Sequence, residues 1–198
     1  MKNNVEDLLT LKSIGIPGKP MKAPSIVAVI WYPSSPSWVK LNTGGLAKGN
    51  PGPAASGGVF RNHRGFVKGV FCCNLGVHSS FFAELHAALT GICIAWDKGW
   101  NQLWLECDSS SVVQCLHNPT FRPPWPLKIK WQNCMHYLKH MQFHCTHIFK
   151  EGNYVADLCA NLGLSVENFR WWWTAPSEFQ PAICHDIFSL PRYRFRPF

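Results

Sequence analysis

Residues 102–111 constrain the fold more than any other part of this chain. Residues 102–105 form a short apolar run that is typical of a buried strand, and residues 109–116 have the pattern of a helix start. Asp108 lies between them. A carboxylate where a strand ends and a helix begins lies at the rim of a sheet, where α/β folds place their sites. The stretch therefore predicts an α/β domain with a site near Asp108.

The size and composition of the chain fit one domain with tails. It has 198 residues, of which 46% are hydrophobic and 14% aromatic, enough for a packed core. No apolar run reaches the roughly 18 residues of a membrane span. The first residues carry early acids and no apolar stretch of the secretory kind. We therefore expect no membrane segment and an intracellular protein, in the nucleus or cytoplasm and not secreted.

Cysteine usage and charge add two further expectations. The nine cysteines are odd in number and form no C-x-x-C pair, which predicts reduced thiols; a disulfide or zinc framework is the alternative. The net charge of +8 suits a polyanionic partner such as nucleic acid, and a basic surface without a partner is the alternative.

Periodicity predicts the order β-β-β-α-β-α-α-β-α, hence a mixed five-stranded sheet flanked by helices. The expected strands are 38–43, 57–61, 66–73, 102–105 and 143–149, and the expected helices are about 80–98, 109–116, 125–141 and a last one capped by Asn153 and ending before Gly163. Residues 44–53 are predicted to be a loop. The expected domains are an arm at 1–37, broken by prolines within 15–24, a core domain at 38–163 and an aromatic, basic tail at 164–198. The tail either packs on the domain or offers a stacking surface for unpaired bases.

Three isolated acids lie at the expected ends of elements. Glu84 falls in the first turns of the helix at 80–98, Asp108 ends a strand, and Asp157 lies on the last helix. Isolated carboxylates from several segments are what two-metal phosphodiester hydrolysis needs, because each Mg²⁺ takes oxygen ligands. Each residue also has an ordinary explanation: a helix-dipole acid for Glu84, an N-cap for Asp108 and a solvated face for Asp157. His147, near the end of a strand, can equally be a histidine without a role.

Five short motifs occur in a fixed order along the chain. They are Asn42-Thr43-x-Gly45, Gly49-Asn50-Pro51-Gly52-Pro53, Ala83-Glu84-Leu85, Glu106-x-Asp108-Ser109 and His147-x-x-x-Glu151-x-Asn153-x-Val155-Ala156-Asp157. Together they resemble a type 1 ribonuclease H (RNase H) domain, and are most similar to the plant reverse-transcriptase-like, retroelement-related subgroup. The resemblance covers about residues 38–163, and the tail is also similar to that subgroup. It implies an RNase H-like mixed sheet flanked by helices.

The resemblance implies a set of roles. Glu84, Asp108 and Asp157 match three of four carboxylates that bind Mg²⁺, and His147 matches a histidine that helps the product leave or shuttles a proton. Asn50 matches a loop amide that contacts the RNA strand of an RNA–DNA hybrid, and Lys48 lies beside it as a further candidate for nucleic-acid binding. The expected partner is therefore an RNA–DNA hybrid.

Two positions depart from the family pattern. Gly44 stands where the family has its first carboxylate, which bridges both metals, and Phe81 stands where many relatives have an asparagine that grips RNA. Losing one ligand should cost roughly 10³-fold or more in rate. We therefore expect a nucleic-acid-binding domain with impaired catalysis. An active Mg²⁺-dependent endoribonuclease is the alternative, and a protein partner or a retroelement fragment without a retained role also stay open.

Basic residues gather around the first three expected strands. They are Lys40, Lys48, Arg61, Arg64 and Lys68. We expect them to reach phosphates, with solvated surface charge as the alternative.

Overall fold

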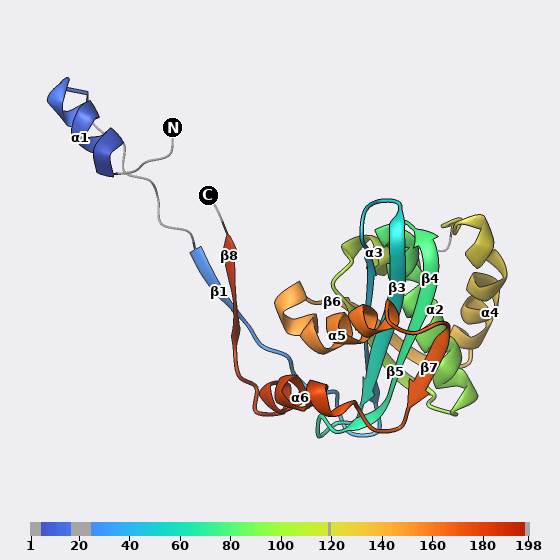
Figure 1. Ribbon diagram of the computed structural model, residues 1–198. Coiled ribbons are helices and arrows are strands. Elements are labelled where there is room, and N and C mark those ends of the chain that lie inside the picture. Colours follow the sequence, from blue (N-terminus) through green and yellow to red (C-terminus); the bar gives the residue numbers. More distant parts are fainter. Residues whose placement is uncertain (1–4, 17–24, 119, 197–198) are drawn as a thin grey trace. The chain divides into compact units, whose positions relative to one another are not determined.

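The computed structural model describes residues 5–16, 25–118 and 120–196, and the chain divides into two compact units. The smaller unit holds helix α1 (Val5–Ser13) and most of a two-stranded sheet of β1 (Ser25–Val29) and β8 (Arg192–Arg196), of which Val29 and Arg192 belong to the larger unit (Figure 1). The larger unit is Val29–Arg192. The proline-rich break expected within 15–24 lies mostly outside the described residues. Residues 29–37, expected in the arm, belong to the larger unit, where Trp31 is buried.

The larger unit is built on one mixed sheet in the order β6-β5-β2-β3-β4-β7. Strands β2, β5 and β6 pair in parallel, whereas β3, β4 and β7 are antiparallel to their neighbours. This confirms the expected mixed α/β class. The strands are β2 (Val39–Ala47), β3 (Gly52–Arg61), β4 (Val67–His78), β5 (Gln102–Cys107), β6 (Gln142–His147) and β7 (Phe169–Trp172). The helices are α2 (Ser80–Asp97), α3 (Ser110–His117), α4 (Lys128–Leu138), α5 (Tyr154–Gly163) and α6 (Gln180–Ile187), with short 3-10 turns η1 (Trp125–Leu127), η2 (Lys150–Asn153) and η3 (Ser177–Phe179).

The sheet has a sixth strand, β7, where the sequence predicted a tail. It pairs with β4, with Trp171 opposite Phe71. The Trp171 ring lies over Gly69, where an added Cβ would come within 2.2 Å of it. The packing of an indole ring over a glycine is a tertiary contact, and strand periodicity does not reveal it. The predicted sheet therefore lacked this strand.

The loop expected at 44–53 is shorter than predicted. Strand β2 continues to Ala47, and β3 begins at Gly52, with Ala47 opposite Ala54. Backbone hydrogen bonds between the two strands override the turn preference of the glycines and prolines, because each pairing satisfies groups that would otherwise need water.

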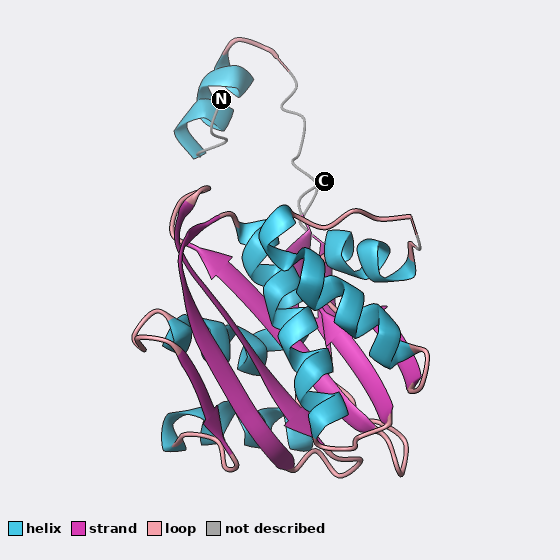
Figure 2. Cartoon of the chain, turned by 90° about the vertical axis from the view of Figure 1, so that its right-hand side faces the viewer, coloured by secondary structure: helices cyan, strands magenta, loops and turns pink. Residues whose placement is uncertain are grey.

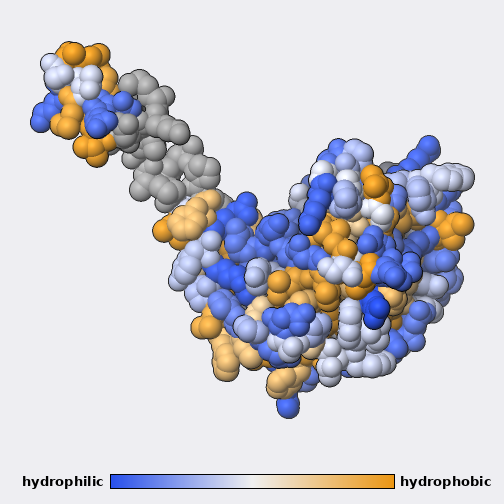
Figure 3. Space-filling model, viewed as in Figure 1, coloured by the Kyte–Doolittle hydropathy of each residue, from blue (hydrophilic) through white to orange (hydrophobic). Residues whose placement is uncertain are grey.

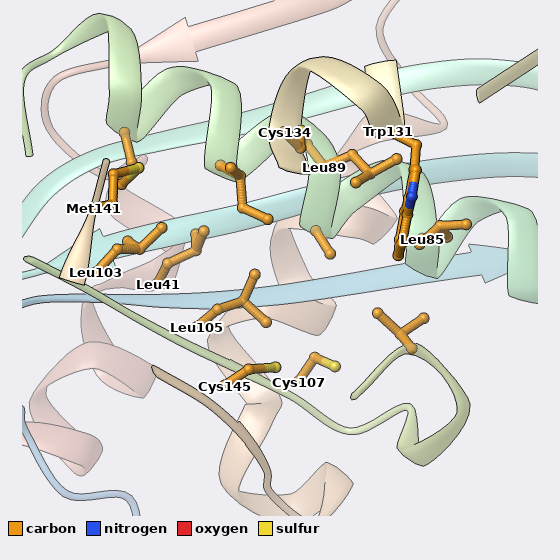
Figure 4. Packing of buried hydrophobic residues seen from close by; sticks show 14 of the residues in the cluster. Leu41, Leu85, Leu89, Leu103, Leu105, Cys107, Trp131, Cys134, Met141 and Cys145 are labelled. Atoms are coloured by element: carbon orange, nitrogen blue, oxygen red, sulfur yellow. Dashed lines mark hydrogen bonds between the residues drawn. The ribbon is translucent and has the colours of Figure 1, made fainter. Parts of the chain in front are cut away.

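Helices cover both faces of the sheet. Figure 2 shows long helices lying over one face and shorter ones behind it. On the first face, Leu85 and Leu89 of α2 lie over Leu41, Leu103 and Leu105 of the sheet (Figure 4). These five side chains have no exposed surface, and each such burial contributes about 2 kcal/mol. On the second face, α5 and α6 cover a separate cluster of Val59, Val70, Val155, Cys159, Phe179, Ala182 and Ile183.

Gly45 sets how closely α2 approaches the sheet. An added Cβ there would lie 2.2 Å from the backbone nitrogen of Glu84 and 2.3 Å from the carbonyl carbon of Ala83. Only a residue without a side chain allows this contact. The first turns of α2 are therefore held against the middle of β2, and Glu84 with them.

The surface of the larger unit mixes polar and apolar side chains. Figure 3 shows hydrophilic and hydrophobic patches interleaved on the face that carries α5 and α6. Among the residues that the structure describes, no helix is long and apolar enough to cross a membrane. All nine cysteines lie within the described ranges and are free thiols.

Candidate functional site

Three carboxylates meet at one end of the sheet. Asp108 directly follows β5, Glu84 lies on α2 against Gly45, and Asp157 lies in the first turn of α5. Their charges act on one another, since Asp108 raises the pKa of both Glu84 and Asp157. The three acids singled out in the sequence, which come from distant segments, are thus neighbours in the fold.

Glu84 is largely buried and lacks the contacts of an ordinary helix-dipole acid. Burial raises its pKa to about 8, and the negative charges of Asp108 and Asp157 add to this, while the N–H of Gly45 and the charge of Lys150 oppose it. Its Oε2 is buried with no hydrogen-bond partner among the described residues. It lies beyond the first turn of α2, which holds no acid. A buried carboxylate oxygen without a donor is a costly arrangement that a cation or proton would relieve.

Asp108 is not the cap of the helix that follows. The cap is Ser109, whose hydroxyl accepts from the backbone N–H of Val112. The carboxylate of Asp108 instead accepts from Asn153 Nδ2 at 2.9 Å. His147, exposed at the end of β6, lies beside it, with Nε2 3.2 Å from the Asp108 carbonyl oxygen. His147 therefore lies next to Asp108, through a contact to its backbone.

Asp157 is partly buried rather than on a solvated face. Burial raises its pKa to about 6, Asp108 adds to the effect, and Lys150 opposes it. The Lys150 ammonium lies 3.7 Å from Asp157 Oδ2, and the lysine side chain is 72% exposed. An exposed pair of this kind is worth about 1 kcal/mol or less, so Lys150 can leave the carboxylate easily.

Gly44 of β2 faces the first turn of α5. A Cβ built at position 44 would lie 3.3 Å from the carbonyl carbon and oxygen of Ala156 and 3.5 Å from the backbone nitrogen of Asp157. Neighbouring Gly45 points to α2 instead, as alternation along a strand requires. A side chain at position 44 would therefore project towards the first turn of α5, beside Asp157.

The donor set does not fit a pair of metal ions. Among the described residues, no three histidine, cysteine, aspartate or glutamate side chains are grouped so that they could hold a metal ion. The Asp108 and Asp157 carboxylates already have an amide and an ammonium as partners, and Gly44 offers no oxygen to bridge two ions. Mg²⁺ needs several oxygen ligands in near-octahedral geometry. The side chains present therefore do not form a two-metal site.

The residues expected to contact nucleic acid lie in the β2–β3 turn. Lys48 and Asn50 are both exposed. Asn50 Oδ1 accepts from the backbone N–H of Ser80 at 3.1 Å, which ties the turn to the start of α2. Phe81, on the first turn of α2, is half-buried and makes an edge contact with Phe121 at 6.4 Å between ring centroids.

A buried amide pair behind the carboxylates was not found from the sequence. Asn153 was expected to cap α5, but its side chain makes no cap hydrogen bond. It points inward and donates to the carbonyl oxygen of Thr43 at 2.8 Å as well as to Asp108. Asn42 Nδ2 donates to Asn153 Oδ1 at 3.2 Å and to Glu106 Oε2 at 3.0 Å. The pair thus fixes the orientation of Asp108 from inside the sheet.

The polar network continues to the C-terminal helix. Arg61 Nη2 donates to Asn42 Oδ1 at 2.7 Å, and Arg61 Nη1 pairs with Asp186 Oδ2 at 2.7 Å. Arg192 Nη1 pairs with Asp186 Oδ1 at 2.6 Å. The Arg61 guanidinium carbon lies 3.6 Å from the centroid of the Trp31 ring. Helix α6 is therefore linked to Asp108 through side-chain hydrogen bonds.

Two basic residues expected to reach phosphates are buried. Lys40 and Arg61 are each 1% exposed, and Lys40 Nζ lies 3.0 Å from Glu106 Oε1. That prediction was wrong for both, because alternation along β2 and β3 turns these side chains under Trp31 and α6 rather than outward. Arg64, in the turn after β3, is exposed as expected.

Comparisons with known proteins agree with this geometry. The sequence profile of the reverse transcriptase-like family matches residues 42–163. A protein from Arabidopsis thaliana, named provisionally as a ribonuclease H protein, is 35% identical over 166 residues, which are 83% of this chain and 27% of that protein. This chain therefore spans about a quarter of that relative.

Solved RNase H structures share the fold. The crystal structure of RNase H1 from the archaeon Halobacterium salinarum NRC-1 is 28% identical with a TM-score of 0.57, over 65% of this chain and 98% of that one. LC11-RNase H1, isolated from compost and solved in complex with an RNA/DNA hybrid, has a TM-score of 0.56 at 23% identity, over 64% and 96% of the two chains. Taken with the profile match over most of its larger unit, these similarities show that the chain belongs to the reverse transcriptase-like family and has an RNase H fold.

Proposed function

We propose that this RNase H-like domain binds RNA–DNA hybrids and that its hybrid-cleaving activity is absent or vestigial. The observation that carries the proposal is Gly44, which faces the backbone of Ala156 and Asp157 from the strand where the first metal ligand would stand. The other candidate residues support the proposal, because the charges of Glu84, Asp108 and Asp157 act on one another and His147 lies beside Asp108.

Hybrid binding is supported by relatives and by the exposed turn. LC11-RNase H1 was solved with an RNA/DNA hybrid. The net charge of +8 favours a polyanion, and Lys48 and Asn50 project from the β2–β3 turn, which is tied to the start of α2. An intracellular place, in nucleus or cytoplasm, is supported by the nine free thiols.

Impaired cleavage follows from the lack of an oxygen ligand at position 44. Phosphodiester hydrolysis assisted by Mg²⁺ would need several carboxylates to hold the ion. Glu84, Asp108 and Asp157 would have to hold it alone, so its binding should be weak or absent. His147 stays near the cluster and could hold or move a proton at Nε2 once its contact with the Asp108 carbonyl oxygen breaks.

The test compares three proteins on one RNA–DNA hybrid with Mg²⁺ or Mn²⁺. The wild-type chain should bind the hybrid and release no measurable product. Gly44→Asp should raise turnover by about 10³-fold or more, because the new carboxylate projects beside Asp157. Gly44→Asn is the matched control, since it has the same size without the charge and should remain silent.

Two outcomes would contradict the proposal. Robust turnover by the wild-type chain, abolished by Asp108→Asn, would show an active endoribonuclease that needs no residue at position 44. Absence of hybrid binding by both the wild-type chain and Gly44→Asp would point to a protein partner instead.

A further inference from the structure

Helices α2 and α4 bring two thiols into contact away from the carboxylate site. Cys93 of α2 and Cys134 of α4 have their sulfur atoms 3.5 Å apart, close enough for one thiol to hydrogen-bond to the other. Cys134 has no exposed surface, and its sulfur also lies 3.3 Å from the carbonyl oxygen of Leu89 (Figure 4). Cys93 is only partly buried, so reagents in solvent can reach it.

We propose that Cys93 and Cys134 form a redox-active dithiol that closes to a disulfide under mild oxidants such as hydrogen peroxide or glutathione disulfide. The sulfur atoms need to move together by about 1.5 Å to reach the disulfide bond length near 2.05 Å. The proposal does not depend on the hybrid-binding function, because neither residue belongs to that site.

The surroundings favour Cys93 as the thiol that reacts first. The hydrogen bond from Cys134 lowers the pKa of Cys93, burial opposes this, and the charge of Lys130 lowers it further. The Lys130 ammonium is held nearby by Thr90 Oγ1 at 3.0 Å and His86 Nε2 at 3.2 Å. A thiolate that is both accessible and next to a cation is the usual site of oxidation.

The reaction balances with either oxidant. With peroxide, the Cys93 thiolate attacks one oxygen, which gives a sulfenic acid and releases hydroxide; the Cys134 thiol then attacks the Cys93 sulfur, and water leaves. With glutathione disulfide, the Cys93 thiolate attacks one sulfur, which breaks the glutathione S–S bond, releases one glutathione and leaves a mixed disulfide. The Cys134 thiol then attacks the Cys93 sulfur and releases the second glutathione. In both cases the two cysteines lose two electrons and two protons, and the oxidant is reduced.

The other thiols provide internal controls. Burial raises the pKa of Cys115, which is partly buried, and Cys184 is exposed. Among the described residues, neither of these two thiols hydrogen-bonds to another sulfur atom. They should therefore take glutathione singly or not at all, without a crosslink.

The experiment treats the reduced full-length chain with glutathione disulfide and maps the product by tryptic digestion and mass spectrometry. Cleavage after lysine separates residues 69–98 from residues 131–139, so a bridge joins two peptides and removes the mass of two hydrogen atoms. The first peptide also holds Cys72 and Cys73, and the variant Cys93→Ser resolves the ambiguity. We expect the crosslinked pair in the wild-type chain and in Cys115→Ser, and its loss in Cys93→Ser and Cys134→Ser.

A second measurement reports the effect on the fold. The bridge closes a loop of 41 residues between two packed helices, so oxidation should raise Tm by about 5 °C or more, and dithiothreitol should reverse the shift. The proposal is overturned if the wild-type chain yields only singly glutathionylated cysteines or sulfinic acid with no joined peptides. It is also overturned if the joined peptides persist in Cys93→Ser.

Discussion

Glu84 is a residue in which the fold opposes the ordinary ionisation of the side chain. It is held against Gly45, with one carboxylate oxygen lacking a hydrogen-bond partner among the described residues. Its pKa is raised by burial and by Asp108, so the folded chain prefers the protonated acid near neutral pH. This preference costs stability whenever the acid is ionised.

The pH dependence of unfolding tests this assignment. The pKa of Glu84 rises from 4.5 to about 8 on folding, so its contribution to stability is full below about pH 4.5 and is lost as the pH rises towards 8. The free energy of unfolding of Glu84→Gln, relative to that of the wild-type chain, should therefore increase by on the order of 3 kcal/mol between pH 5 and pH 8. Urea unfolding at several pH values measures the difference. Asp157→Asn is the control, because its free energy of unfolding relative to the wild-type chain should stop increasing above about pH 6. An equal pH dependence in both variants would refute the assignment of the raised pKa to Glu84.

At the scale of elements, α6 is attached to the sheet by charge as well as by apolar packing. Asp186 is buried between Arg61 and Arg192, and Arg61 also donates a hydrogen bond to Asn42 of β2. A buried ion pair adds little by itself, but removing one partner leaves an uncompensated charge.

Removal of Asp186 should therefore be severe. Asp186→Ala should lower the free energy of unfolding by about 3–5 kcal/mol, measured by urea denaturation. Glu178→Ala, an exposed acid just before the same helix, should stay within about 0.5 kcal/mol of the wild-type chain. Similar losses in both variants would mean that α6 is held by general surface charge.

Elements with strong local periodicity were predictable, and those set by tertiary contacts were not. Glu84, Asp108 and Asp157 could be singled out because each lies at the edge of a helix or strand that the apolar pattern defines. The inward orientation of Asn153 could not, because its partners Asn42 and Asp108 come from strands more than 40 residues away in sequence. Strand β7 escaped prediction for the same reason, since only contact with β4 distinguishes its aromatic run from a tail.

At the scale of the whole molecule, net charge overstates the surface available to a polyanion. The chain carries a net +8, yet Lys40 and Arg61 are enclosed and already paired. Hybrid binding should therefore depend on the exposed lysines and arginines, of which Lys48 lies in the same turn as Asn50.

Salt dependence separates charge from polar contact in that turn. Lys48→Gln should weaken hybrid binding and reduce the slope of log K against log salt by about 1, because one phosphate contact is lost. Asn50→Ala should weaken binding while leaving the slope unchanged, since an amide releases no counterion. Fluorescence anisotropy over a salt series measures both, and an unchanged slope in Lys48→Gln would remove Lys48 from the interface.

The glycine at position 44 has a consequence for any hybrid in the same compartment. An added Cβ at position 44 would lie 3.3 Å from the backbone of Ala156, so β2 and the first turn of α5 pack closely here without a carboxylate between them. A domain that occupies a hybrid without cutting it withholds that hybrid from cleaving relatives. Under the proposed function, the lifetime of hybrids in a mixture with an active RNase H should lengthen as the concentration of this chain increases.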